Sequence, residues 1–318
     1  MKYLSLLKYP YVNTLLQKII KHTSSSQLLI VKQMMEYFCA SEKDLPSAIT
    51  KMKQSQYHII LDYAMEQNKR ASIQTKDTIL KNMERLDSMD FIALKPSSLL
   101  ERDLERILDI CKEKRQKIMI DAEEYEYQQK VHLYIRTLQE KYNTRLFPCI
   151  YNTYQCYLKT TYKQIMNDIE YFDKIQLPIA IKLVRGAYLE YEIQNAQKKN
   201  LPIPVFESIH QTNVCYNRCM LHTIQHAKEQ QVYLNIATHN PNSIQLARQY
   251  AKPYDKHICF SQLKGIRDDL SQKLLLEGYI VYKYLPYGEY SIMVPYLLRR
   301  LQESKMNFTT IDYFSKIV

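Results

Sequence analysis

Charged and hydrogen-bonding residues stand where the apolar runs of this chain end. They are Lys95, Asp121, Gln155, Lys182, Arg185, Thr238, His239 and Tyr284. A single Lys or Asp in such a place is usually a solvated loop residue or a helix cap. Several of them in register on one face of a sheet form a site in which lysines, an arginine and one carboxylate converge. Such a site suits a small ligand that carries a carboxylate.

Short β-prone runs must position these residues. We predict eight strands, separated by amphipathic segments, at 57–62, 91–95, 118–121, 148–154, 178–184, 232–237, 257–261 and 279–284. Near-continuous apolar runs are typical of parallel strands covered on both faces, and the segments between them supply the helical crossovers. Eight alternating units favour a (β/α)8 barrel over an open doubly wound sheet.

Two of the crossover helices can be read in detail. Ser98 and Glu101 form a possible capping box. Apolar residues then recur at helical spacing up to Cys111, and the cations of 112–117 suit the C-terminus of a helix. The stretch 206–230 is a similar but longer crossover. Residues 1–55 are expected to be helices outside the barrel, 56–304 the barrel itself, and 305–318 a short tail.

Three strings of sequence occur in a fixed order. Lys182–Glu190 reads KLVRGAYLE, Ala237–Asn240 reads ATHN, and Tyr296–Glu303 reads YLLRRLQE. Together they resemble the signature of the proline dehydrogenase family, flavoenzymes that oxidise L-proline. The resemblance is best from about Tyr57 to Glu303. It implies a (β/α)8 barrel, FAD as cofactor, and removal of a hydride from the carbon next to the proline nitrogen, followed by reoxidation by a membrane quinone.

The resemblance also implies which residues bind the substrate. Lys95, Arg299 and Arg300 would hold the proline carboxylate, with Tyr296 on the same helix face as Arg299 and Leu263 as apolar wall. From spacing alone the two arginines could equally be exposed, because neighbouring helical residues point about 100° apart. Tyr284 would pack against the proline ring. Hydroxyproline-preferring relatives carry a smaller residue there, so this tyrosine favours proline.

The remaining assignments concern the cofactor. Lys182 would lie near the reactive edge of the flavin, where a cation stabilises charge on the reduced ring. Asp121 would hydrogen-bond behind it, although an acid here also suits a helix N-terminus. Contacts with FAD are implied for Ala122, Gln155, Lys182, Arg185, Gly186, Ala187, Thr238, His239, Asn240 and Glu303. A lone histidine is more often packed in a core than bound to a ligand, but Thr-His-Asn at a strand end is unusual for a core.

The chain has only four glycines, at 186, 265, 278 and 288. They are too far apart for the G-x-G-x-x-G fingerprint or a P-loop. Something else must therefore hold the phosphates of any dinucleotide, and backbone amides and basic side chains at the ends of barrel strands are available for this. Leu189 and Ser304 depart from the family pattern, in which tryptophan and asparagine are common, and the chain contains no tryptophan.

Composition limits the class of protein. A net charge of +11 could indicate a protein that binds nucleic acid. The basic residues are spread among acids rather than gathered in a stripe, so no nucleic-acid partner is expected. Seven scattered cysteines favour free thiols in a reducing compartment. No apolar run reaches the roughly 20 residues that span a bilayer. We expect a cytoplasmic protein, peripheral at most at the membrane, or a mitochondrial one in a eukaryote.

The N-terminal stretch is basic. It carries five lysines and no acid before Glu36. We interpret it as a structural helix, with a surface that touches anionic lipid as the alternative. It lacks an evident signal-peptide cleavage site and has no arginine before Arg70, as a transit peptide would favour.

Two other functions remain open at this point. One is a flavin-dependent barrel oxidoreductase that acts on hydroxyproline or a related cyclic amine. The other is a basic, non-catalytic barrel that binds nucleic acid or a lipid surface. Reduction of a bound flavin by proline or by hydroxyproline separates the first from proline oxidation. A colourless protein that binds polyanions with steep salt dependence would indicate the second.

Overall fold

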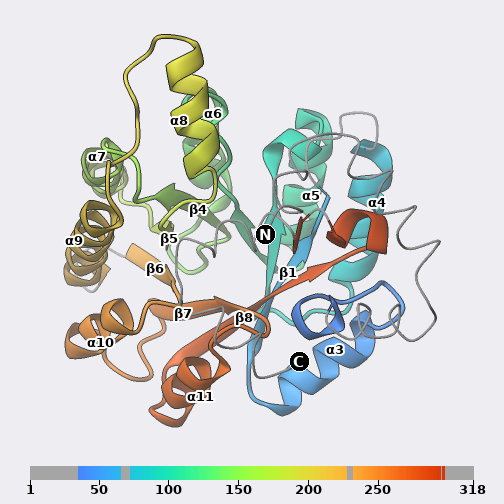
Figure 1. Cartoon of the computed structure of the whole chain (residues 1–318). Coiled ribbons are helices and arrows are strands. Elements are labelled where there is room, and N and C mark those ends of the chain that lie inside the picture. The colour runs from blue at the N-terminus through green and yellow to red at the C-terminus, as the bar shows by residue number, and fades with distance from the viewer. Residues whose placement is uncertain (1–34, 66–71, 228–231, 295, 298–318) are drawn as a thin grey trace, which may run out of the picture.

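Eight parallel strands close into a barrel (Figure 1). The computed structural model describes residues 35–65, 72–227, 232–294 and 296–297. In chain order the strands are β1 (His58–Tyr63), β2 (Phe91–Leu94), β3 (Lys117–Ile120), β4 (Ile150–Gln155), β5 (Ile179–Val184), β6 (Val232–Ala237), β7 (Ile258–Leu263) and β8 (Ile280–Tyr287). Each pairs with its sequence neighbours, and β8 pairs with β1. The predicted barrel is confirmed, with a strand at each of the eight runs.

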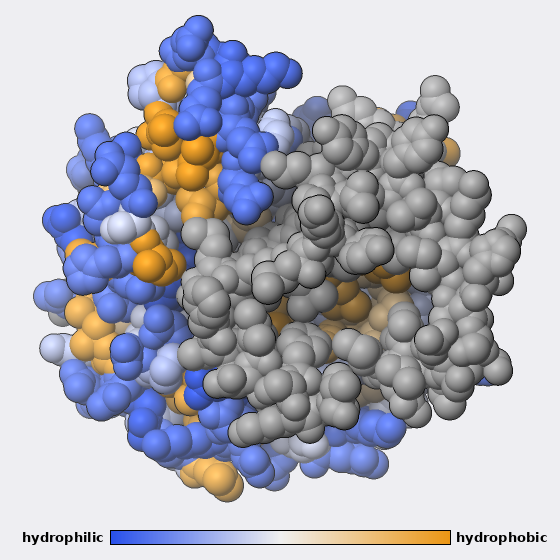
Figure 2. Space-filling view, in the orientation of Figure 1, coloured by the Kyte–Doolittle hydropathy of each residue, from blue (hydrophilic) through white to orange (hydrophobic). Residues whose placement is uncertain are grey.

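Helices lie around the outside of the strands (Figure 1). They are α3 (Leu45–Gln54), α4 (Ser72–Met83), α5 (Glu101–Glu113), α6 (Tyr125–Tyr142), α7 (Thr161–Lys174), α8 (Leu189–Lys198), α9 (Ile209–Ala227), α10 (Pro241–Tyr250) and α11 (Asp268–Leu276). Among these described helices, none has the length and apolar character that crossing a membrane requires. On the side of the molecule drawn in Figure 2, the surface of the described residues is mostly hydrophilic, with apolar residues in separate areas.

The predicted capping box at the start of α5 is wrong. Leu100 occupies the N-cap position, and no side chain caps the helix. Ser98 instead belongs to a 3-10 turn, η3 (Pro96–Ser98), and its hydroxyl donates to the Lys95 carbonyl at 2.7 Å. The turn directly after β2 takes the hydroxyl that a capping box would use. The longer crossover predicted at 206–230 is the helix α9.

The strands alternate between an inner and an outer face. One buried cluster, which fills the barrel interior, contains Ile60, Phe91, Ala93, Met119, Tyr151, Ala180, Cys259, Tyr282 and Tyr284. The intervening residues, such as Ile59, Ile118 and Leu183, join two larger clusters between the strands and the helices. Since successive strand side chains point to opposite faces, every second residue beyond the inner cluster also faces inward.

The described N-terminal residues join the carboxyl end of the barrel. Ala40 forms a parallel bridge with Tyr287, and the Gly288 amide donates to the Ala40 carbonyl at 3.2 Å. The chain then turns into α3, which packs beside β1. Residues 1–34 and 298–318 lie outside the described residues, and the segment boundaries at 55 and 304 remain predictions.

Candidate active site

The inward alternation brings charged residues together at the carboxyl ends of the strands. Asp62 follows Ile60 by two, Asp121 follows Met119 by two, and Lys182 follows Ala180 by two. Lys95 stands two residues beyond Ala93, which is in register with Asp62 on β1. The four side chains therefore meet above the apolar interior, at the end of a barrel where enzymes carry their active sites.

Asp121 connects two of the predicted residues. Its Oδ1 accepts a hydrogen bond from Lys182 Nζ at 2.7 Å, and its Oδ2 accepts one from the Tyr284 hydroxyl. Lys182 Nζ also lies 4.9 Å from the centre of the Tyr284 ring. The carboxylate is thus bonded within the site rather than at the N-terminus of α6, which begins four residues later, at Tyr125.

Asp62 was missed by the sequence analysis. Its Oδ1 pairs with Lys95 Nζ, and both side chains are buried. Lys95 Nζ also approaches the Tyr63 carbonyl at 3.5 Å. The sequence pattern that indicated Asp121 also applies to Asp62. Asp62 ends the first apolar run, as Asp121 ends the third. We expect the Asp62 carboxylate to fix the direction of the Lys95 ammonium.

Two carboxylates and two ammonium groups share this buried space. Burial alone would raise the pKa of Asp121, but Lys182 and Lys95 outweigh it and the pKa is lowered. For Asp62 burial dominates and the pKa is raised, with Asp121 adding to the effect and Lys95 opposing it. Burial and both carboxylates also raise the pKa of Tyr284 well above its usual value, so the phenol stays protonated and donates a hydrogen bond to Asp121.

A second cluster surrounds Arg185, at the end of β5. The guanidinium donates from Nε to Asn213 at 2.7 Å, from one terminal nitrogen to Thr238 at 2.7 Å, and from the other to Ser243 at 2.9 Å. These acceptors are neutral, and no carboxylate of the described residues pairs with Arg185. Asn213 and Ser243 lie on α9 and α10 and had no recognisable sequence signal. An arginine held by neutral oxygens, with two N–H groups left over, suits an anion such as phosphate.

The backbone beside Arg185 has little room. Gly186 has a φ of +132°, and a β-carbon there would stand 2.6 Å from Cγ of the Tyr157 ring. The Ala187 amide faces Gln155 Oε1 at 3.4 Å, and Gln155 Nε2 donates to the Glu123 carbonyl at 2.8 Å. Gln155 is thus fixed between the ends of β3 and β5. Ala122, between Asp121 and the buried Glu123, is half-buried.

Gly186→Ala is expected to destabilise the protein by about 1–3 kcal/mol, because the added methyl group strains the backbone and displaces the Tyr157 ring. The free energy of unfolding in urea measures the change. Gly288→Ala is the control. Its β-carbon would meet no atom closer than 3.5 Å, although its backbone is also left-handed, with a φ of +151°. Equal losses in the two variants would contradict the role of Tyr157.

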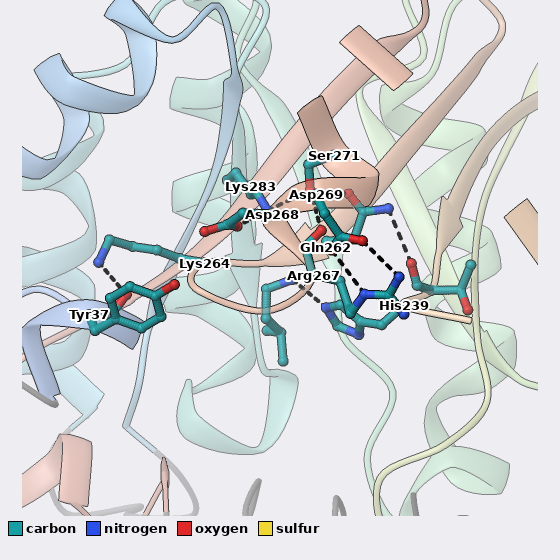
Figure 3. Close-up of polar contacts among 11 residues, drawn as sticks. Tyr37, His239, Gln262, Lys264, Arg267, Asp268, Asp269, Ser271 and Lys283 are labelled. Carbon is teal, nitrogen blue, oxygen red and sulfur yellow. Dashed lines mark hydrogen bonds and ion pairs between the residues drawn. The ribbon is translucent and has the colours of Figure 1, made fainter. Parts of the chain in front are cut away.

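His239 lies where β6 ends and is uncharged. Burial, with Lys283, Arg267 and Arg185 nearby, lowers its pKa to about 3. Its Nε2 accepts the Leu263 amide at 2.9 Å, so the neutral ring carries its hydrogen on Nδ1 (Figure 3). Leu263 is the last residue of β7 and packs on the inner cluster with Tyr284.

Two other predicted cofactor residues have structural partners. The Thr238 hydroxyl accepts one hydrogen bond from Arg185 and one from the Asn240 amide. Asn240 caps α10, and its side chain accepts the Asn242 and Ser243 amides at 2.9 and 3.1 Å. Of the C-terminal assignments, Tyr296 is buried against Met35, Cys39, Ala64 and Met293. Arg299, Arg300 and Glu303 lie outside the described residues.

A family model described as proline dehydrogenase matches residues 22–312. The chain belongs to the proline dehydrogenase family. It is 34% identical to hydroxyproline dehydrogenase of Bos taurus over 211 residues, covering 64% of this chain and 46% of that protein. It is 33% identical to mitochondrial proline dehydrogenase 1 of Homo sapiens over 236 residues, covering 72% of this chain and 37% of that protein.

A solved structure shares the family fold. Proline utilization A from Bdellovibrio bacteriovorus, inactivated by N-propargylglycine, superposes with a TM-score of 0.78 at 18% identity, over 87% of this chain and 33% of that one. The family barrel is therefore present in this chain. The chain spans less than half the length of these relatives.

Proposed function

We propose that this chain oxidises L-proline to Δ1-pyrroline-5-carboxylate with a bound flavin, FAD. The observation that carries the proposal is the buried group of Lys95, Asp121, Lys182 and Tyr284 at the barrel mouth. Fixed cations hold a small zwitterion in one pose, and orientation of this kind supplies much of a rate enhancement. Membership of the family supports the same reaction.

The residues near β5 and β6 fit such a cofactor. Arg185 offers two unused N–H groups and a charge that no described carboxylate neutralises. Gly186 lets the Tyr157 ring pack against the backbone beside Arg185, and His239 presents Nδ1–H. We assign these residues, with Gln155, Ala187 and Thr238, to the flavin and its phosphates. When bound, the flavin supplies the two-electron chemistry that no side chain can perform.

The chain's own residues then perform distinct tasks. Lys95, directed by Asp62, would bind the proline carboxylate together with Arg299 and Arg300. Asp121 holds the Lys182 ammonium in place, where it would stabilise negative charge on the reduced flavin. Tyr284 packs on the proline ring, and Tyr296 and Leu263 complete the apolar wall. Ala122, Asn240 and Glu303 remain proposed cofactor contacts.

Hydroxyproline is the second candidate substrate, because relatives about one third identical bear the name hydroxyproline dehydrogenase. Tyr284 is the residue that separates the two. Its ring is buried and its hydroxyl is tied to Asp121, which leaves little space for a substituent on the proline ring.

Tyr284→Ser is expected to raise kcat/KM for 4-hydroxyproline relative to L-proline by roughly tenfold. Removing the ring makes room for the hydroxyl, and the free energy of one well-made hydrogen bond corresponds to about this factor. Flavin reduction by each substrate, measured in stopped flow, gives the ratio. Tyr284→Phe is the matched control, since it keeps the ring. An unchanged ratio in Tyr284→Ser would remove this residue from substrate selection.

An absorbance spectrum of the purified protein, before and after anaerobic L-proline, tests the proposed reaction. We expect a flavin spectrum that bleaches with L-proline and not with D-proline. Bleaching by 4-hydroxyproline alone would favour the second substrate. Protein that stays colourless after FAD is added would overturn the proposal and favour a non-catalytic barrel.

We further propose that a membrane quinone reoxidises the flavin. The basic exterior of the protein suits peripheral contact with anionic lipid. Several relatives are named as mitochondrial proteins, which supports a mitochondrial location in a eukaryotic cell. For a bacterial cell we propose a cytoplasmic location.

A further inference from the structure

Lys264 joins three parts of the barrel mouth. It follows β7 directly, and its backbone amide donates to the Tyr284 carbonyl at 3.0 Å. Its side chain reaches the N-terminal segment 35–40, where Nζ donates to the carbonyls of Glu36 and Tyr37, the latter at 2.6 Å (Figure 3). Residues 35–38 are helical, so both carbonyls belong to a last helical turn. The end of a helix carries a partial negative charge and favours a cation.

The segment 35–40 also packs closely on the loop that carries Lys264. The Tyr37 ring lies over Gly265, where a β-carbon would stand 2.7 Å from two ring atoms. Gly265 has a φ of +77°, which a side chain would strain as well. Lys264 is half-buried, and burial lowers its pKa. The ammonium is therefore bound in a partly enclosed place rather than extended into solvent.

The far side of the segment contacts the proposed substrate pocket. Met35 and Cys39 form one buried cluster with Ala64 and Tyr296. Ala64 follows Tyr63, whose carbonyl lies 3.5 Å from Lys95 Nζ. The carboxylate of Asp62 acts on the pKa of the Cys39 thiol, as does Lys264, so this thiol lies near both charged groups. A shift of the segment would disturb the packing of Tyr296 and of the residues beside Lys95.

We propose that Lys264 is a positioning residue for substrate, which holds the segment 35–40 against Tyr296 and so fixes one wall of the proline pocket. The inference rests on the proposed function for the identity of the substrate. The hydrogen bonds from Lys264 to the segment 35–40 are contacts among described residues. Neither the Lys182–Asp121–Tyr284 group nor the Arg185 cluster contacts the Lys264 side chain, so the reacting edge and the cofactor are expected to keep their geometry.

Lys264→Met removes the hydrogen bonds to the Glu36 and Tyr37 carbonyls and keeps nearly the length of the side chain. We expect the KM for L-proline to rise by roughly tenfold, the value of about one hydrogen bond from a charged donor, with kcat changed less than about twofold. The Kd for FAD should be unchanged. Amide hydrogen exchange of residues 35–40 should become faster, a readout that needs neither substrate nor turnover. Lys264→Arg keeps a cationic donor and should restore slow exchange and most of the affinity for proline.

Lys273→Met is the matched control, because Lys273 is exposed on α11 and far less enclosed than Lys264. It should change neither KM nor exchange. A wild-type KM, or wild-type exchange at residues 35–40, in Lys264→Met would overturn the inference. If instead the wild-type flavin is not reduced by proline, the proposed function fails, and the pocket assignment of Lys264 fails with it. If Lys264→Met does not fold, Lys264→Gln and Lys264→Arg decide by the same measurements.

Discussion

Asp121→Asn is expected to slow reduction of the flavin by L-proline about 100-fold while the flavin stays bound. Asp121 accepts one hydrogen bond from Lys182 and one from Tyr284, and both bonds are partly buried. Asparagine has nearly the same shape but no charge, and it offers Lys182 a much weaker acceptor. A hydrogen bond that involves a charged group contributes about 1.5–3 kcal/mol, and 1.4 kcal/mol corresponds to a factor of ten in rate.

Asp121→Ala is expected to cost about 3–5 kcal/mol of stability, because it leaves the buried Lys182 ammonium without its carboxylate partner. Stopped-flow absorbance gives the rate of flavin reduction, and urea unfolding gives the stability. Tyr284→Phe removes only the bond between Tyr284 and Asp121 and should lose less activity than Asp121→Asn. If Asp121→Asn reduces its flavin at the wild-type rate, Lys182 does not depend on Asp121.

The barrel could be predicted from the sequence because β-prone apolar runs alternate with amphipathic helical segments along the chain. Eight apolar runs that alternate with amphipathic segments leave few other ways to bury both faces of each strand. The alternation of side chains along each strand explains why Lys95, Asp121 and Lys182 meet, since each ends an inward-facing series. Asp62 obeys the same rule, and alternation along β1 would have found it.

Other parts of the site had no local signal. Asn213 and Ser243 bind Arg185 from α9 and α10, and only the closed barrel brings those helices to the end of β5. The tie from Lys264 to Tyr37 joins residues 227 positions apart in the chain. Ser98 shows that a local pattern can also mislead. Its spacing to Glu101 matched a capping box, but its hydroxyl donates to the Lys95 carbonyl in the turn after β2. Local patterns predict elements, whereas contacts between distant elements require the tertiary structure.

Arg185→Met is expected to weaken FAD binding by roughly 100-fold or more. The wild-type guanidinium is held by three neutral oxygens from Asn213, Thr238 and Ser243, and no described carboxylate compensates its charge. Two N–H groups remain for an anion. Two charge-assisted hydrogen bonds to a phosphate contribute about 3 kcal/mol, which corresponds to a hundredfold change in Kd.

Flavin content after gel filtration and the Kd for FAD, from quenching of flavin fluorescence, measure this change. Arg185→Lys keeps the charge but loses the planar arrangement of donors, so its Kd should lie between those of the wild type and Arg185→Met. Arg218→Met is the matched control on α9. It removes a guanidinium that lies over the Tyr162 ring at 3.7 Å, and FAD binding should not change. Full flavin content in Arg185→Met would mean that the charge of Arg185 is balanced by something other than the cofactor.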